Sequence, residues 1–215
     1  IESVFGNRED VKGCSRTDSG VHANMFCCNF RTEKDIPVSK IPAALNANLP
    51  FDIAVKSCKE VPYDFHARYD CKGKEYVYKI WNAQERNPFT NGLYYHYKYN
   101  LDAGMLNTEA QSFVGVHNFS SFCAAGSSVE DMTREIYSCR VERQGDEVLF
   151  YVSGNGFLYN MVRIMVGTLI DIASGKIEKG KISEIISAEN REKAGFTAPP
   201  EGLYLNKVYY DEREM

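Results

Sequence analysis

Hydrophobic side chains recur every three to four positions near the C-terminal end of the chain, and this spacing predicts its clearest α-helix. The residues of this apolar stripe are Leu158, Met161, Val162, Met165, Val166, Leu169, Ile170 and Ala173. Gly175 is expected to end the helix. Shorter helices are predicted after the capping residues Ser39 and Asp102, and an exposed one over residues 181–189.

Stretches rich in β-branched and aromatic residues predict the strands. They cover residues 25–30, 53–61, 74–81, 93–99, 134–144, 147–153 and 203–210. The stretch 74–81 alternates charged or aromatic with apolar residues, which is typical of a half-exposed strand. Gly145-Asp146 forms the turn of a predicted hairpin. Strands outnumber helices and are mostly joined by turns, so we predict an α+β fold with a largely antiparallel sheet.

The 215 residues are 44% hydrophobic and 25% charged, which is typical of a globular protein with one large domain or two small lobes. No apolar run reaches the roughly 18–20 residues that a membrane span requires. The first residues lack the pattern of a signal peptide. They also lack an initiator Met and a clear periodicity, so we expect that an N-terminal segment is missing.

The chain has seven cysteines, an odd number, and none forms a Cys-x-x-Cys pair. A zinc site usually needs closely spaced ligands, and a disulfide scaffold is usually shorter with an even count. We therefore expect no metal and a reducing, cytoplasmic compartment, with most thiols buried as small hydrophobic side chains. The net charge of −4 gives no support for RNA binding, so an RNA enzyme with this balance has to concentrate positive charge in one cleft.

The small polar segment Arg16-Thr17-Asp18-Ser19-Gly20 directly precedes a predicted strand. One interpretation is a tight turn in which Asp18 and Ser19 bond to the local backbone, and by composition alone this is the more common use. The other interpretation is a functional loop that displays the carboxylate of Asp18, with a basic residue two positions away.

Arg163 lies in an apolar stretch, residues 157–173, whose only other charged residue is Asp171. A helix that is apolar nearly all round is buried, and a buried guanidinium needs a carboxylate partner. Alternatively, Arg163 lies at the helix edge and extends its head to water. A buried arginine beside a carboxylate would keep the carboxylate ionised, which is the form that a carboxylate nucleophile requires.

Tyr76 and Tyr78 are two positions apart and therefore share one face of their strand. A tyrosine there can stack on a nucleobase, although cross-strand packing is the more common use in a chain with 14 tyrosines. The four histidines are widely scattered, so we expect structural or surface roles for them. No Gly-rich phosphate loop is present.

The segment Ser15-Arg16-Thr17-Asp18-Ser19-Gly20-Val21-His22-Ala23 closely resembles the signature of TruA-type tRNA pseudouridine synthases. Five further blocks resemble this family and follow in the same order over most of the chain. They are residues 44–50 with 52–55, 65–69 with 74–78, 118–122 with 133–134, 155–163, and 201–205. Two features depart from the family: the usual opening strand with a Tyr-Asp-Gly…Trp-Gln type motif and the helix after it are absent, and Ser15 stands where many members have Gly.

The resemblance implies two RRM-like α/β lobes that share a largely antiparallel central sheet, with the active cleft between them. We expect the lobes to be residues 1–62, with the catalytic Asp loop, and residues 63–215. The implied reaction is the isomerisation of uridine to pseudouridine at positions 38–40 of the tRNA anticodon arm, without cofactor or metal. The implied enzyme is a cytoplasmic homodimer that presents tRNA across both subunits.

The resemblance also implies residue roles. Asp18 is the nucleophile, and it acts at the ribose C1′ or the uracil C6, or assists glycal formation. Arg163 pairs with Asp18, and Tyr76 stacks on the target uracil and helps with proton transfer. Arg16 fills the space that the flipped base leaves in the RNA. Leu203 lines the base pocket.

Three other readings compete with this one. A noncatalytic RNA-binding module on the same lobes would not need an ionised carboxylate beside a buried arginine. A glycoside hydrolase usually needs two catalytic carboxylates, and Asp18 is the only well-placed candidate. A related synthase would modify uridines elsewhere in tRNA or in another RNA.

Overall fold

The computed structural model describes residues 1–6, 10–127 and 129–211. The chain forms two compact units. The first contains Ile1–Arg16 and Cys27–Cys71, and the second contains Thr17–Phe26 and Lys72–Met215. The segment with Asp18 therefore groups with the second unit, and the lobe boundary expected at residues 62 and 63 remains a prediction.

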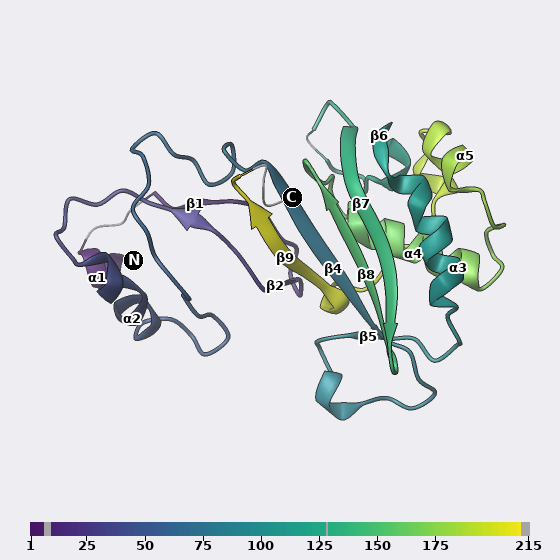
Figure 1. Cartoon of the computed structure of the whole chain (residues 1–215), viewed down its shortest axis with the longest axis horizontal. Helices are drawn as coiled ribbons and strands as arrows, with labels where there is room; N and C mark the ends of the chain where they lie inside the picture. Colours follow the sequence, from purple (N-terminus) through teal and green to yellow (C-terminus); the bar gives the residue numbers. More distant parts are fainter. Residues whose placement is uncertain (7–9, 128, 212–215) are drawn as a thin grey trace. The chain divides into compact units, whose positions relative to one another are not determined.

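The second unit is built on a seven-stranded sheet (Figure 1). Its strands run in the order β2-β9-β4-β8-β7-β6, and β5 pairs with β4. Their bounds are β2 His22–Ala23, β4 Gly73–Trp81, β5 Tyr95–His96, β6 Gly115–Asn118, β7 Thr133–Gln144, β8 Glu147–Gly154 and β9 Leu203–Tyr209. Only the β2–β9 and β4–β5 pairs are parallel among the strand pairs of the described residues. The predicted α+β class and the largely antiparallel sheet are confirmed.

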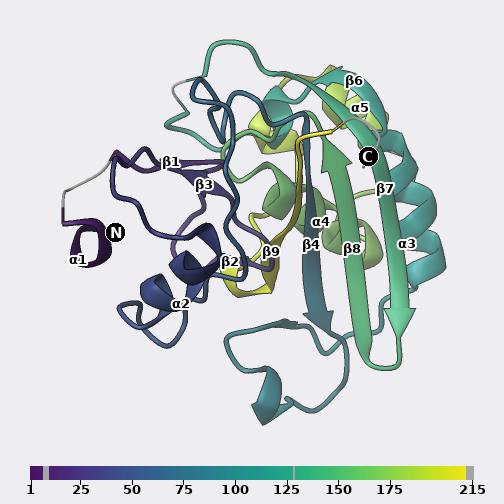
Figure 2. The same ribbon diagram turned by 60° about the vertical axis from the view of Figure 1, so that its left-hand side comes forward.

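Three α-helices cover one face of this sheet (Figures 1 and 2). They are α3 Ala103–Ala110, α4 Met161–Ala173 and α5 Ile182–Ser187. Asp102 caps α3 as predicted, because its side chain accepts a hydrogen bond from the Met105 amide. The predicted long helix is α4, and Gly175 follows it with a φ of 76°. The helix expected to be exposed is α5, which instead buries Ile182, Ile185 and Ile186.

The strand β4 lies in the middle of the sheet and is buried on both faces. Tyr76, Tyr78 and Ile80 point to the side on which α4 contacts β4. Val77 points to the other side, where it packs with Leu149 and Tyr204. The expectation of a half-exposed strand is therefore wrong, because β8 and β9 flank β4 and apolar residues cover both of its faces.

The first unit contains two short strands, β1 Lys12–Gly13 and β3 Cys28–Asn29, which pair antiparallel. Its helices are α1 Glu2–Phe5 and α2 Ile41–Asn46. The helix expected near Ser39 is confirmed, but Ser39 lies in the 3-10 turn before α2, and α2 has no side-chain cap. Short 3-10 turns in the chain are Val38–Lys40, Pro88–Thr90, Gln111–Phe113, Ser120–Phe122, Arg191–Lys193 and Pro200–Gly202.

Three of the predicted strands are absent or much shorter. Residues 53–61 form no strand, because the Asn46 side chain takes the place of a strand partner and bonds both the amide and the carbonyl of Val55. The stretch 25–30 is a strand only at Cys28–Asn29, and the stretch 93–99 only at Tyr95–His96.

Three of the seven cysteines, Cys14, Cys123 and Cys139, are buried. The four that are not buried, Cys27, Cys28, Cys58 and Cys71, belong to the smaller first unit. The expectation that most thiols are buried is wrong, because the small core of this unit does not cover them. None of the helices in the described part of the chain is long and apolar enough to cross a membrane.

The packing of α4 yields a prediction about stability. A Cβ atom added at Gly167 would overlap the backbone carbonyl of Phe196. We expect Gly167→Ala to lower the free energy of unfolding by about 2 kcal/mol. Differential scanning calorimetry measures the effect against Gly156→Ala, where the added Cβ would lie 3.5 Å from the Arg134 side chain, an ordinary contact. Equal melting temperatures of the two variants would contradict the close packing.

Candidate active site

Asp18 lies in a turn that leads directly into β2. The Val21 amide donates to the Asp18 carbonyl at 3.1 Å. Gly20 has a φ of 81°, which favours glycine, and an added Cβ would lie 3.1 Å from the Pro200 side chain. The segment is therefore a tight turn that leaves the Asp18 side chain 34% exposed. That this loop is a functional one stays a prediction.

The side chain of Asp18 forms an ion pair with Arg163. The Arg163 Nη1 atom lies 3.2 Å from the Asp18 Oδ2 atom, and the Arg163 side chain is only 14% exposed. The alternative in which Arg163 extends its head to water is therefore wrong. The predicted pairing is present, and both partners belong to the second unit.

Two further groups hold the guanidinium of Arg163. Its Nε donates to the Ala198 carbonyl at 2.7 Å, and its Nη1 donates to the Asn160 side chain at 2.7 Å. Asn160 precedes α4 in a left-handed conformation, with a φ of 60°. A non-glycine residue in this region costs free energy and often marks a functional site. The arginine is thus fixed from three separate segments of the chain.

Sequence reasoning gave no role to Asn160 or to the Ala198 carbonyl. A usable signal for Asn160 was present, since asparagine tolerates left-handed backbone and stands three positions before the arginine, at the start of the long apolar helix. A backbone carbonyl such as that of Ala198 leaves no mark in the sequence.

Tyr76 and Tyr78 lie on the helix-covered face of β4 and differ in their surroundings. The Tyr76 ring is 7% exposed and packs edge-to-face with Phe157, with 5.1 Å between ring centroids. Tyr78 is fully buried, and its hydroxyl donates to the Pro199 carbonyl at 2.7 Å. Burial, with a smaller effect of Glu201, raises the pKa of Tyr78 well above its usual value, so this hydroxyl stays a neutral donor.

A β-bulge lies directly beside Tyr76. The register between β4 and β9 shifts between Glu75 and Tyr76, so that Asn206 is the extra residue. The Asn206 amide donates to Glu75 at 2.6 Å and accepts from the Asn24 amide at 2.9 Å. Bulges of this kind redirect side chains and are common near active sites. The bulge ties the end of β2 to both β9 and β4.

The other two predicted site residues lie in different units. Leu203 begins β9, is 7% exposed and is paired with Tyr78 across the sheet, beside the 199–202 segment. Arg16 is exposed and belongs to the first unit. Within the described residues, no group of three or more His, Cys, Asp or Glu side chains is arranged to hold a metal ion.

Comparison with known proteins identifies the family. A family model described as tRNA pseudouridine synthase matches residues 1–70 and 110–211. The tRNA pseudouridine synthase A of Clostridium acetobutylicum is 43% identical over 210 residues, 98% of this chain and 86% of the relative. The protein of that name from Staphylococcus aureus (strain Newman) is 44% identical over 201 residues, 94% of this chain and 75% of the relative. The chain belongs to the tRNA pseudouridine synthase family.

Membership confirms the resemblance and makes the chain an isomerase. The residues matched to the tRNA pseudouridine synthase model include Asp18, Arg163 and Leu203. Tyr76 falls in the gap between the two matched stretches. The family model therefore covers both residues of the ion pair. It does not cover Tyr76, so only the position of Tyr76 on β4 relates it to the candidate site.

The conformation of Asn160 can be tested by two substitutions. Asn160→Gly removes the amide but keeps a residue suited to a φ of 60°, whereas Asn160→Ala removes the amide and strains the backbone. We expect the alanine variant to be less stable than the glycine variant by about 1 kcal/mol. Urea denaturation measures the difference, and a more stable alanine variant would show that position 160 does not hold a left-handed conformation.

Proposed function

We propose that the chain converts uridine to pseudouridine at positions 38–40 of the tRNA anticodon arm, with the Asp18 carboxylate as the nucleophile. The ion pair of Asp18 with the buried Arg163 is the observation that carries this proposal. The names of the relatives, tRNA pseudouridine synthase A, support tRNA as the substrate. The resemblance supports the anticodon arm, a homodimer and a cytoplasmic location.

The chemistry needs one reactive carboxylate. The N1–C1′ bond of the nucleotide breaks and a C5–C1′ bond forms, while a proton leaves C5 and N1 gains one. In the route at C1′, a carboxylate oxygen bonds to C1′ as uracil leaves with the electron pair. After the base rotates, C5 bonds to C1′ and expels the carboxylate. Attack at C6 and glycal formation also begin at the same carboxylate.

The contacts of Arg163 suit this task. The guanidinium contacts the Oδ2 atom of Asp18, which leaves Oδ1 for the substrate. Because Ala198 and Asn160 also hold the guanidinium, the carboxylate has a fixed partner before RNA arrives. A preorganised group reacts faster, since little reorganisation is needed in the transition state. A noncatalytic RNA-binding protein has no comparable use for this arrangement.

The remaining roles complete the proposal. Tyr76 stacks on the target uracil and assists the proton transfer from C5. Tyr76 is only 7% exposed and packs edge-to-face with Phe157, so the Phe157 ring has to move before a uracil can stack on Tyr76. Leu203 lines the base pocket, and Arg16 occupies the space that the flipped base leaves in the RNA.

Asp18→Asn tests the nucleophile. The amide retains an oxygen that accepts from Arg163 but is a poor nucleophile, so we expect loss of pseudouridine formation with tRNA binding within a few-fold of wild type. Product is measured on a tRNA anticodon arm by mass spectrometry, and binding by a filter assay. Asp146→Asn, the same change in the exposed hairpin turn, is the matched control and should keep full activity. Full activity of Asp18→Asn would disprove the proposal.

Arg163→Lys tests the fixed guanidinium. Lysine keeps the charge but cannot bond Ala198, Asn160 and Asp18 with one planar fork, so we expect kcat to fall by about 10- to 100-fold. Arg143→Lys is the control, because the Arg143 guanidinium is held in a similar way. It donates to the Asn82 side chain and to the backbone carbonyls of Leu101 and Gly145. Comparable losses of kcat in both variants would mean that the effect is one of stability.

A further inference from the structure

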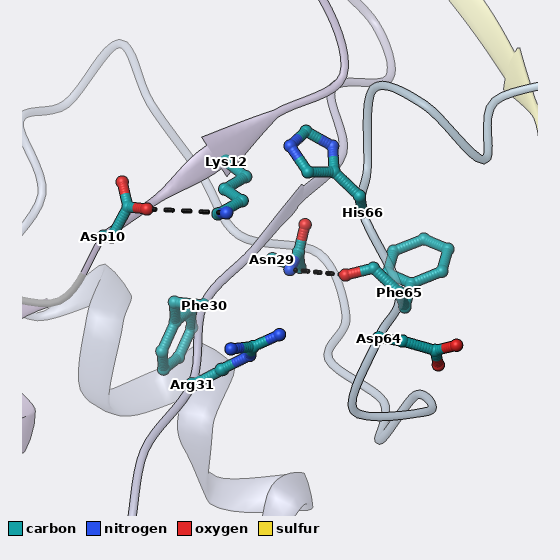
Figure 3. A pocket seen from close by; sticks show the side chains of 8 residues that line it. All are labelled: Asp10, Lys12, Asn29, Phe30, Arg31, Asp64, Phe65 and His66. Atoms are coloured by element: carbon teal, nitrogen blue, oxygen red, sulfur yellow. Dashed lines mark hydrogen bonds and ion pairs between the residues drawn. The ribbon is translucent and has the colours of Figure 1, made fainter.

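The first unit contains two adjoining hollows, and Arg16 is the only residue of their lining to which the proposed function gives a role. One has a volume of about 260 Å³ and the other of about 370 Å³, and both are lined by Asp10, Lys12 and His66. Figure 3 shows the first of the two. Arg31 lines the first, and Arg16 and Arg68 line the second. We call the two together the basic hollow, defined by Lys12, Arg16, Arg31, His66 and Arg68.

The charge of this lining contrasts with that of the whole chain. Four cationic side chains and two carboxylates, Asp10 and Asp64, line the basic hollow, in a chain whose net charge is −4. Lys12 lies 3.6 Å from Asp10, but their side chains are 39% and 85% exposed, so this pair contributes little. A local excess of positive charge on an acidic protein is a feature that selects an anionic ligand.

His66 is held so that a hydrogen-bond donor remains available. Its Nδ1 atom accepts from the amides of Arg68 at 3.1 Å and Tyr69 at 3.4 Å. The ring nitrogen that accepts carries no proton, so the proton of the neutral ring lies on Nε2. The imidazole therefore lines the basic hollow with an N–H group, which suits an acceptor such as a phosphate oxygen.

The backbone around His66 is fixed as well. The Asn29 side chain donates to the Phe65 carbonyl at 3.1 Å and accepts from the Ala67 amide at 2.8 Å, one on each side of His66. The His66 amide donates to the Asp70 carboxylate at 2.7 Å. Figure 3 shows Asn29 between the Lys12 side chain and the Phe65 backbone, with His66 above it. The donor is thus part of a rigid turn rather than a mobile loop.

Two exposed aromatic rings lie next to these side chains. Tyr69 is 76% exposed and packs against the His66 ring, with 4.2 Å between ring centroids. Tyr63 is 78% exposed and lies under the Arg31 guanidinium at 3.9 Å. Cations that track a phosphate backbone, combined with exposed rings on which bases stack, are typical of proteins that bind single-stranded RNA.

We propose that the basic hollow binds backbone phosphates of the RNA substrate, with Lys12, Arg68 and the His66 Nε2–H as contacts and Tyr69 as a stacking surface for an adjacent base. The inference rests on the proposed function only for the identity of that RNA as tRNA. It assigns to the first unit a binding role that is independent of the reacting carboxylate.

The test measures the Kd of unmodified full-length tRNA at several salt concentrations. The main variant is Lys12→Gln with Arg68→Gln, and the matched control is Lys40→Gln with Lys59→Gln, two exposed lysines of the same unit that do not line the basic hollow. We expect the main variant to raise Kd about tenfold and to reduce the slope of log Kd against log salt by about 1.5, the value for two lost phosphate contacts. The control should keep the wild-type Kd and slope.

A second variant covers the histidine. In His66→Asn the side-chain oxygen can still accept from the Arg68 and Tyr69 amides, but the Nε2 donor is lost, so we expect a weaker Kd with an unchanged melting temperature. Equal slopes for the main and control variants would overturn the proposal. Tight binding of inorganic phosphate together with an unchanged tRNA Kd in the main variant would also overturn it, because the hollow would then serve a free anion.

These outcomes are separable from those of the proposed function. Asp18→Asn leaves the basic hollow intact, so the salt dependence of tRNA binding should not change in that variant. If Asp18→Asn is active, Asp18 is not the nucleophile, and the proposal for the basic hollow is unaffected. Conversely, Asp18→Asn could be inactive while the main and control variants show equal slopes of log Kd against log salt. That result would support Asp18 as the nucleophile and would show that the basic hollow does not contact RNA.

Discussion

The guanidinium of Arg163 is a charged group that is almost removed from water, and such a group must be neutralised and hydrogen-bonded. The second unit meets this requirement with a carboxylate from the turn before β2, a side chain at the start of α4 and a backbone carbonyl from the segment before β9. Each of these segments is far from the others in sequence. Satisfying this one cation, which is almost removed from water, therefore fixes where the Asp18 carboxylate lies.

The segment that supplies the Ala198 carbonyl is itself held against α4. The Thr168 hydroxyl accepts from the Gly195 amide at 2.9 Å, and the Asp171 carboxylate accepts from the Phe196 amide at 3.3 Å. Gly167 and Gly195 allow the two backbones to approach closely, because an added Cβ at either position would collide with backbone atoms. The only other charge of the apolar stretch, Asp171, thus anchors the segment on which Arg163 depends.

Much of this arrangement could be predicted from the sequence, and the exceptions have physical causes. The α4 stripe, the cap at Asp102 and the β7–β8 hairpin depend on local patterns, and all three are present. The charged residue in an apolar helix led to one of two predictions, a carboxylate partner, and Asp18 is that partner. The missing strand at 53–61, the bulge at Asn206 and the contact with Ala198 depend on partners distant in sequence, which no local pattern reveals.

The central claim is that the carboxylate held by Arg163 is the group that meets the nucleotide. A crystal structure of Asp18→Asn bound to a tRNA anticodon arm tests it most directly. We expect a flipped uridine whose C1′ or C6 atom lies about 3–3.5 Å from the side chain at position 18, which is a reactive distance. The Arg163 guanidinium should still contact that side chain. A target uridine bound against a different part of the protein, with position 18 facing solvent, would contradict the account.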